Sequence, residues 1–165
     1  MTRARRVLGF AIGSGKIGFA YLVDGELMDW RLSIKASRSF DGAFKQALEW
    51  IIYYKPELVV FEEIDTSTRK GAHSLSLIQA VESAANNANV EIARMPRPSI
   101  GPNKYAGAAE LAAEFPQIAS WLPHPRRLWE TEPRNIIYFE ALALVWTWWK
   151  SSGRGSPEQE LDADA

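Results

Sequence analysis

Residues 7–34 read VLGFAIGSGKIGFAYLVDGELMDWRLSI, and this stretch decides the fold. Apolar runs at 7–12 and 16–23 are separated by Gly13-Ser14-Gly15, and an alternating apolar run follows at 26–34. The last two runs are joined by Asp24-Gly25, a dipeptide that strongly favours a tight hairpin turn. Three adjacent strands joined by short turns predict an antiparallel meander.

The apolar pattern changes period after residue 34. Spacings of three and four residues predict a helix over 40–52, which Lys55-Pro56 ends. Leu58 to Phe61 is continuously apolar, as expected for a central strand covered on both faces. The remaining expected elements are a helix at 72–87, a strand at 90–93, and helices at 103–115 and 133–150. This order predicts an α/β fold, a mixed sheet with helices on both faces.

The chain has 165 residues, of which 47% are hydrophobic and 12% aromatic. This is enough for one domain with a substantial core, which we expect over residues 1–150. Residues 151–165 are polar and acidic, and we expect a disordered tail there. There is no cysteine, which excludes disulfides and thiolate metal sites and fits a reducing compartment.

The basic N-terminal residues are not followed by the apolar segment of a signal peptide. The longest apolar stretch, 136–149, is interrupted by Glu140 and is too short to span a bilayer. We therefore expect a cytoplasmic protein without a membrane partner.

The net charge of −1 does not by itself indicate a nucleic-acid partner. Its distribution is more informative, because segments 66–81 and 92–109 contain basic residues and no acid. Four acids lie in the expected tail at 156–165. The folded part of the chain is therefore more basic than the total charge indicates.

The segment Gly13-Ser14-Gly15-Lys16 is superficially similar to a phosphate-binding P-loop, but it does not match that motif. That motif needs a glycine at the position of Phe10 and Ser or Thr at the position of Ile17. The segment also joins two expected strands, whereas a P-loop opens a helix.

Three carboxylates stand out. Glu62 and Glu63 end the apolar strand at 58–61, and alternation places them on opposite faces of the sheet. They either belong to a site or mark the point where the strand leaves the core. Glu140 lies within the apolar helix at 133–150, where it either occupies a narrow solvent-facing stripe or, if buried, indicates a site.

These segments together resemble one family. Residues 7–14, VLGFAIGS, resemble the first strand of RuvC-type Holliday-junction resolvases, which reads hydrophobic-Gly-hydrophobic-Asp-Pro-Gly-Ser. Residues 56–62, PELVVFE, resemble the strand that ends in the family's second acid, and 139–143, FEALA, resembles the final helix. The resemblance covers about residues 7–150 and implies a ribonuclease-H-like fold.

The resemblance implies a metal-dependent endonuclease that cleaves branched DNA in recombination and repair. Such enzymes hold Mg²⁺ or Mn²⁺ ions with clustered carboxylates and hydrolyse a phosphodiester by a two-metal mechanism. The matching ligands here are Glu62 and Glu140, with Glu63 as a substitute. A homodimer is implied, because paired incisions require two sites.

The chain departs from the family at two positions. Ala11 stands where the family has its first metal-binding aspartate, and Ile136 and Ile137 occupy the turn that usually carries a further acid. We therefore expect weak metal binding and slow or absent cleavage. Either an active nuclease has been inactivated by replacing aspartate at position 11, or a natural lineage has lost catalysis.

Basic residues near these acids are candidates for DNA contact, although most charged runs are solvated surface. The candidates are Arg69 and Lys70, which follow the strand that carries Glu62, together with Lys16; Arg94, Arg97, Lys104, Arg126 and Arg127 are weaker. Trp146, Trp148 and Trp149 are better explained by packing or a subunit interface, and His73 and His124 are left without a role.

The sequence is also compatible with two other functional classes. One is a catalytically silent DNA-binding or assembly protein of the same fold. The other is a nucleotide-binding domain of the actin and sugar-kinase type, which shares the opening strands but usually needs a second domain that this length does not provide.

Overall fold

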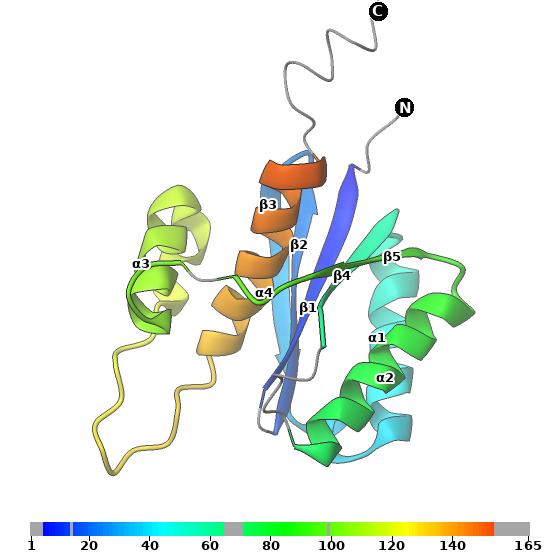
Figure 1. Ribbon diagram of the computed structural model, residues 1–165, viewed down its shortest axis with the longest axis horizontal. Coiled ribbons are helices and arrows are strands. Elements are labelled where there is room, and N and C mark those ends of the chain that lie inside the picture. The colour runs from blue at the N-terminus through cyan, green and yellow to red at the C-terminus, as the bar shows by residue number, and fades with distance from the viewer. Residues whose placement is uncertain (1–4, 14, 65–70, 99, 154–165) are drawn as a thin grey trace, which may run out of the picture.

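The computed structural model describes residues 5–13, 15–64, 71–98 and 100–153. They contain a five-stranded sheet in the order β3-β2-β1-β4-β5 (Figure 1). β1 pairs antiparallel with β2 and β2 with β3, whereas β4 lies parallel to β1 and β5 parallel to β4. The strands are β1 (Arg6–Gly13), β2 (Lys16–Val23), β3 (Glu26–Ser33), β4 (Leu58–Glu62) and β5 (Glu91–Met95).

Helices cover both faces of the sheet (Figure 1). One face packs against α1 (Phe40–Tyr54) and α2 (Ala72–Asn87), and the other against α4 (Ile136–Trp148), with α3 (Lys104–Glu114) outside it. The short helical turns are η1 (Lys35–Arg38), η2 (Pro116–Trp121) and the π-type turn η3 (Trp149–Gly153). None of the helices in the described ranges combines the length and apolar character that crossing a membrane requires.

The predicted fold class and element order are confirmed, and β2 and α2 have the predicted bounds. The last helix begins at Ile136 and not at Pro133, because the residues between them form a turn. The amides of Ile136, Ile137 and Tyr138 each donate to the carbonyl three residues earlier, which is the tighter 3₁₀ pattern. Helical structure also continues through residue 153, beyond the predicted start of the tail at 151, and residues 154–165 lie outside the described residues.

The predicted hairpin turn lies between β2 and β3. Asp24 and Gly25 have φ values of 51° and 82°, so both central residues adopt the left-handed conformation that a primed turn needs. A side chain at position 25 would also collide with the Trp149 ring, because a Cβ there would lie 2.6 Å from Nε1. The turn is therefore fixed by the local sequence and by packing of the end of the last helix.

The core between the sheet and α1 is aromatic. Phe10 and Phe61 stack with ring centroids 5.8 Å apart, and Phe19 meets Trp50 edge to face at 4.9 Å. All four side chains are buried. Such pairs add to the free energy gained by burying apolar area, so this face anchors α1 to the centre of the sheet.

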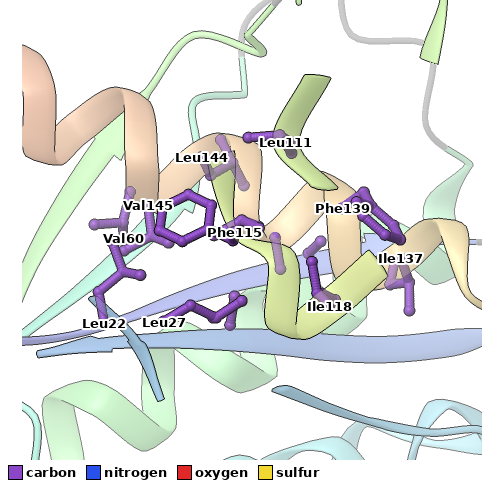
Figure 2. Close-up of a cluster of buried hydrophobic side chains, with 14 of the residues drawn as sticks. Leu22, Leu27, Val60, Leu111, Phe115, Ile118, Ile137, Phe139, Leu144 and Val145 are labelled. Carbon is purple, nitrogen blue, oxygen red and sulfur yellow. The ribbon is translucent and has the colours of Figure 1, made fainter. Parts of the chain in front are cut away.

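The opposite core is built around α4, which is buried on nearly all sides. Its side chains Phe139, Leu144 and Val145 gather with Leu111 and Phe115 in one cluster (Figure 2). α4 is thus enclosed between the sheet and the layer of α3 and η2, which explains its uniformly apolar composition.

Two glycines let α4 approach the sheet closely. A Cβ at Gly9 of β1 would lie 2.7 Å from Cβ of Val145 and 2.8 Å from the Ala141 carbonyl oxygen. A Cβ at Gly18 of β2 would lie 2.9 Å from Cγ1 of Ile137. Real Cβ contacts are not this short, so the position of α4 depends on the absence of side chains at these two positions.

A polar cluster ties α1 to the edge strand β3. The Tyr54 hydroxyl donates to Asp29, and Arg31 Nε donates to the Tyr54 oxygen at 3.2 Å and to Asp29 at 3.2 Å. Partial burial, and next the hydrogen bond to Asp29, raise the pKa of Tyr54 to about 12. The neutral hydroxyl is therefore the form that stabilises the fold.

We predict that Gly9→Ala destabilises the protein by about 1–3 kcal/mol, because a methyl group has no space beneath α4. Urea unfolding measures the change. Val145→Ala in the same chain removes only the 3.3 Å contact with Val145 Cγ1 and leaves those with Val145 Cβ and the Ala141 carbonyl, so it should restore little of the loss. An unchanged stability of Gly9→Ala would show that α4 is free to shift.

Tyr54 should stabilise the fold in a pH-dependent way. Because its folded-state pKa of about 12 exceeds the ordinary value of 10.0, its contribution is complete below the ordinary pKa and is lost as pH rises through the folded one. The free-energy difference between wild type and Tyr54→Phe, measured by urea unfolding, should therefore shrink over that range. A difference that stays constant with pH would contradict this assignment.

Candidate active site

A cavity of about 410 Å³ opens where β1, β4, α3 and α4 meet. Its lining includes five residues that the sequence singled out, which come from four separate segments of the chain: Ala11, Glu62, Arg97, Lys104 and Glu140. The structure thus brings Glu62, Glu140 and two of the predicted basic residues to one place.

The strands account for the positions of Ala11 and Glu62. β1 and β4 are parallel neighbours, so their carboxyl ends lie at the same edge of the sheet. Side chains two or four residues apart in a strand point to the same face of the sheet, so Ala11 shares a face with Val7, and Glu62 with Val60. Both valines belong to the core beneath α4. Residues 11 and 62 therefore share one face, the face that α4 covers.

The packing of α4 determines where Glu140, the third residue of the site, lies. Ala141 and Ile137 lie against Gly9 and Gly18, and Glu140 lies between them in the sequence of the helix. Its carboxylate lines the cavity and is half-buried, with 23% of the side chain exposed. The alternative of an exposed stripe on α4 is thereby excluded, because Glu140 faces the cavity.

Glu62 and Glu63 differ in their surroundings. Glu62 is half-buried and lines the cavity. Glu63 is exposed, does not line the cavity, and donates its backbone amide to the Met95 carbonyl at 2.6 Å. Of the two, Glu62 is the one that shares the cavity with Glu140.

Two ion pairs set the charge at the cavity. Arg97 Nη2 lies 3.9 Å from Glu140 Oε2, and the arginine is 62% exposed. Lys104 Nζ lies 2.5 Å from Glu132 Oε2. Both cations lie at the rim, where long side chains can keep their charged groups in water and exchange partners at little cost.

These residues do not fit a two-metal centre. Within the part of the chain that the structure describes, no three His, Asp or Glu side chains come together in a way that could hold a metal ion. Glu62 and Glu140 are the acids of the cavity, while Ala11 and Ile136 present apolar side chains to it. Divalent cations such as Mg²⁺ need more oxygen ligands or several retained waters.

The other predicted basic residues that the structure describes do not line this cavity. Lys16 is 7% exposed. Arg94 pairs with Glu82 at 3.1 Å. Arg69 and Lys70 lie outside the described residues.

Two of the three tryptophans at 146–149 and one of the two histidines have structural contacts. Trp149 is buried, and the Trp146 ring meets Phe115 edge to face at 4.9 Å, so packing explains them. His73 Nε2 is 2.7 Å from the Ser37 carbonyl oxygen, which ties the start of α2 to η1.

One wall of the cavity was missed from the sequence. Residues 100–103 line it, and Asn103 accepts hydrogen bonds from the amides of Tyr105 and Ala106, both at 3.0 Å, which starts α3. Gly107 then packs on this wall, because a Cβ there would lie 2.3 Å from the Ile100 carbonyl oxygen. The signal in the sequence is the proline- and glycine-rich stretch 96–102 before a helix cap.

No protein-family model matches the chain. No curated protein matches it either. Several solved structures are similar to the chain. RuvC of Thermus thermophilus superposes with a TM-score of 0.61 at 19% identity, covering 90% of this chain and 96% of RuvC.

The fowlpox virus resolvase, solved with its substrate Holliday junction DNA, gives a TM-score of 0.58 at 11% identity over 88% of this chain and 97% of the resolvase. The yeast mitochondrial Holliday junction resolvase gives 0.51 at 11% identity, over 93% of this chain and 83% of that one. This chain has the ribonuclease-H-like fold of the Holliday junction resolvases. The predicted resemblance to the RuvC-type fold is confirmed.

We predict that Ala11→Asp makes the cavity bind divalent cations. Ala11 lines the cavity beside the two glutamates, so a carboxylate there would complete a cluster of three acids. Mn²⁺ should raise the melting temperature of this variant and leave wild type nearly unchanged, since a ligand stabilises the state that binds it. Calorimetric titration with Mn²⁺ provides a second readout.

Glu62 and Glu63 offer a matched control for this experiment. In the Ala11→Asp chain, Glu62→Gln should abolish the Mn²⁺ effect, whereas Glu63→Gln should leave it intact, because Glu63 does not line the cavity. Equal effects of the two substitutions would mean that Mn²⁺ binds elsewhere.

Proposed function

We propose that this chain binds branched DNA as a resolvase-type protein, and that its cavity is a nuclease site in which metal-binding carboxylates are missing at two positions. The observation that carries the proposal is the convergence of Ala11, Glu62 and Glu140 on one cavity. They come from β1, β4 and α4 of a fold shared with Holliday junction resolvases. With the missing carboxylates restored, the reaction class would be metal-dependent hydrolysis of a phosphodiester in a four-way junction.

The rim of the cavity supports DNA as the partner. Arg97 and Lys104 lie there, and both pair with carboxylates that a phosphate can replace. A DNA phosphate near Glu140 would draw Arg97 away from that acid and leave the carboxylate available. Each neutralised phosphate also releases counterions, so binding should weaken steeply with salt.

Mg²⁺ or Mn²⁺ belongs to the proposal as the cofactor, with Glu62 and Glu140 as its ligands. Two carboxylates, one of them paired with Arg97, hold such an ion weakly. We therefore expect wild type to cleave slowly or not at all. A homodimer in the cytoplasm completes the proposal, since two incisions across a junction need two sites.

A second candidate is a protein that binds junctions and never cleaves them. The apolar side chain of Ile136 in the cavity favours it, because a second acid is then missing as well. In this case Arg97 would serve permanently as the countercharge of Glu140. Restoring position 11 separates the two candidates.

We predict that Ala11→Asp cleaves a four-way junction in Mn²⁺ at least tenfold faster than wild type, and that adding Glu140→Gln removes the gain. Removing a group that acts on the transition state typically costs orders of magnitude in rate, so the effect should be clear. Gel assays with end-labelled junctions measure it. Junction binding without cleavage by Ala11→Asp would favour the second candidate, and equal, negligible binding of junction and linear duplex at low salt would overturn both.

A further inference from the structure

The loop formed by residues 122–135 connects η2 to α4 and projects beyond the helices at the end of the molecule where β1 ends (Figure 1). Its tip carries two large apolar side chains. Leu128 is fully exposed and Trp129 is 77% exposed. A single exposed apolar residue is ordinary, but two adjacent ones at the tip of a loop indicate a contact surface.

The loop is held in place by several polar contacts. At its ends, Asn135 Nδ2 donates to the Trp121 carbonyl at 3.1 Å, and Glu132 pairs with Lys104. At its tip, the Glu130 amide donates to the Arg127 carbonyl at 3.0 Å, which closes a turn around Leu128 and Trp129. The loop therefore presents its tip in a defined orientation.

The same contacts connect the loop to the active-site cavity. Lys104 lines the cavity and also pairs with Glu132 of the loop. A ligand that occupies the cavity rim and extends past Lys104 would therefore reach the loop. Only a long ligand could contact both the cavity and the loop tip, because the tip itself does not line the cavity.

The charge of the loop is favourable for an anionic ligand. It contains three arginines, and its two glutamates are occupied by Arg127 and Lys104. In the described ranges, neither Arg126 nor Arg134 has a carboxylate partner within ion-pair distance. Arg126 and Arg134 lie on either side of Trp129 in the sequence, and Arg126 Nη1 donates to the Glu130 carbonyl at 3.2 Å.

The Trp129 ring itself is held by a neighbouring cation. The Arg127 guanidinium lies 5.6 Å from its centroid, within the range of a cation–π interaction. This contact limits the motion of the ring and leaves most of it exposed to solvent. An exposed, oriented indole between arginines is suited to stacking on a nucleobase, because every base offers a π face.

We propose that Trp129 stacks on a base that is unpaired or unstacked at the branch point of a DNA junction, while Arg126 and Arg134 bind the flanking phosphates. This inference rests on the proposed function, since it assigns the branch-point contact of the same DNA ligand. A second copy of this chain is less suitable as the occupant. A standard interface covers about 800 Å² on each partner, and a convex loop tip with two apolar side chains offers much less.

The test compares Trp129→Ala with Tyr53→Ala, an equally exposed aromatic at the end of α1 on the other face of the sheet. Full-length proteins are titrated with a four-way junction and with a linear duplex of the same sequence. The junction carries 2-aminopurine at its branch point, because the fluorescence of this base changes when its stacking partner changes. Sedimentation velocity gives the oligomeric state of each variant.

Trp129→Ala should weaken junction binding about tenfold, which lies within the range measured for base–aromatic stacking, and should leave duplex binding nearly unchanged. It should also abolish the 2-aminopurine signal, whereas Tyr53→Ala should match wild type in every readout. Arg126→Ala should lower affinity and reduce the salt dependence of binding without removing the fluorescence change.

The outcomes separate this inference from the proposed function. If wild type binds junctions and Trp129→Ala does so equally well with the same fluorescence change, the inference is overturned and the proposed function stands. If Trp129→Ala dissociates an oligomer, the tip is a subunit interface and the inference is again overturned. If wild type does not bind junctions at all, the proposed function itself fails.

Discussion

The contact between α4 and the first two strands is the constraint on which the rest of the structure depends. Gly9 and Gly18 remove the side chains that would hold the helix away from the sheet, and Ala141 and Ile137 fill the resulting space. Shape complementarity of this kind is sensitive to single methyl groups, because interiors are packed at near-crystalline density. The same contact encloses the apolar helix and fixes its rotation about its axis.

That rotation determines the chemistry of the cavity. It places Glu140 in the lining of the cavity that Glu62 of β4 and Ala11 of β1 also line. Two carboxylates without a metal would repel each other, and Arg97 supplies a positive charge at 3.9 Å from Glu140. Arg97 therefore offsets part of the negative charge of the cavity, and an anionic ligand that attracts Arg97 would remove this compensation.

The cavity and the 122–135 loop form one continuous surface through Lys104 and Glu132. The cavity offers carboxylates beneath a cationic rim, while the loop offers an exposed indole beside arginines. These properties are complementary to those of the long polyanion with accessible bases that we propose as the ligand, with its phosphates along the rim and a base at the tip. A small ligand in the cavity would leave the exposed tip without a role.

The sequence by itself determined the order and type of the elements, because apolar periodicity and turn residues such as Asp24-Gly25 are local signals. It also selected Glu62 and Glu140, since carboxylates in apolar segments need a reason to be there. Only the tertiary structure decided that Ile136 lines the cavity, that Arg97 pairs with Glu140, and that residues 100–103 form a wall. It also revealed the exposure of Trp129. These facts depend on how segments far apart in the chain meet, and the rotation of a uniformly apolar helix leaves no periodic trace in its sequence.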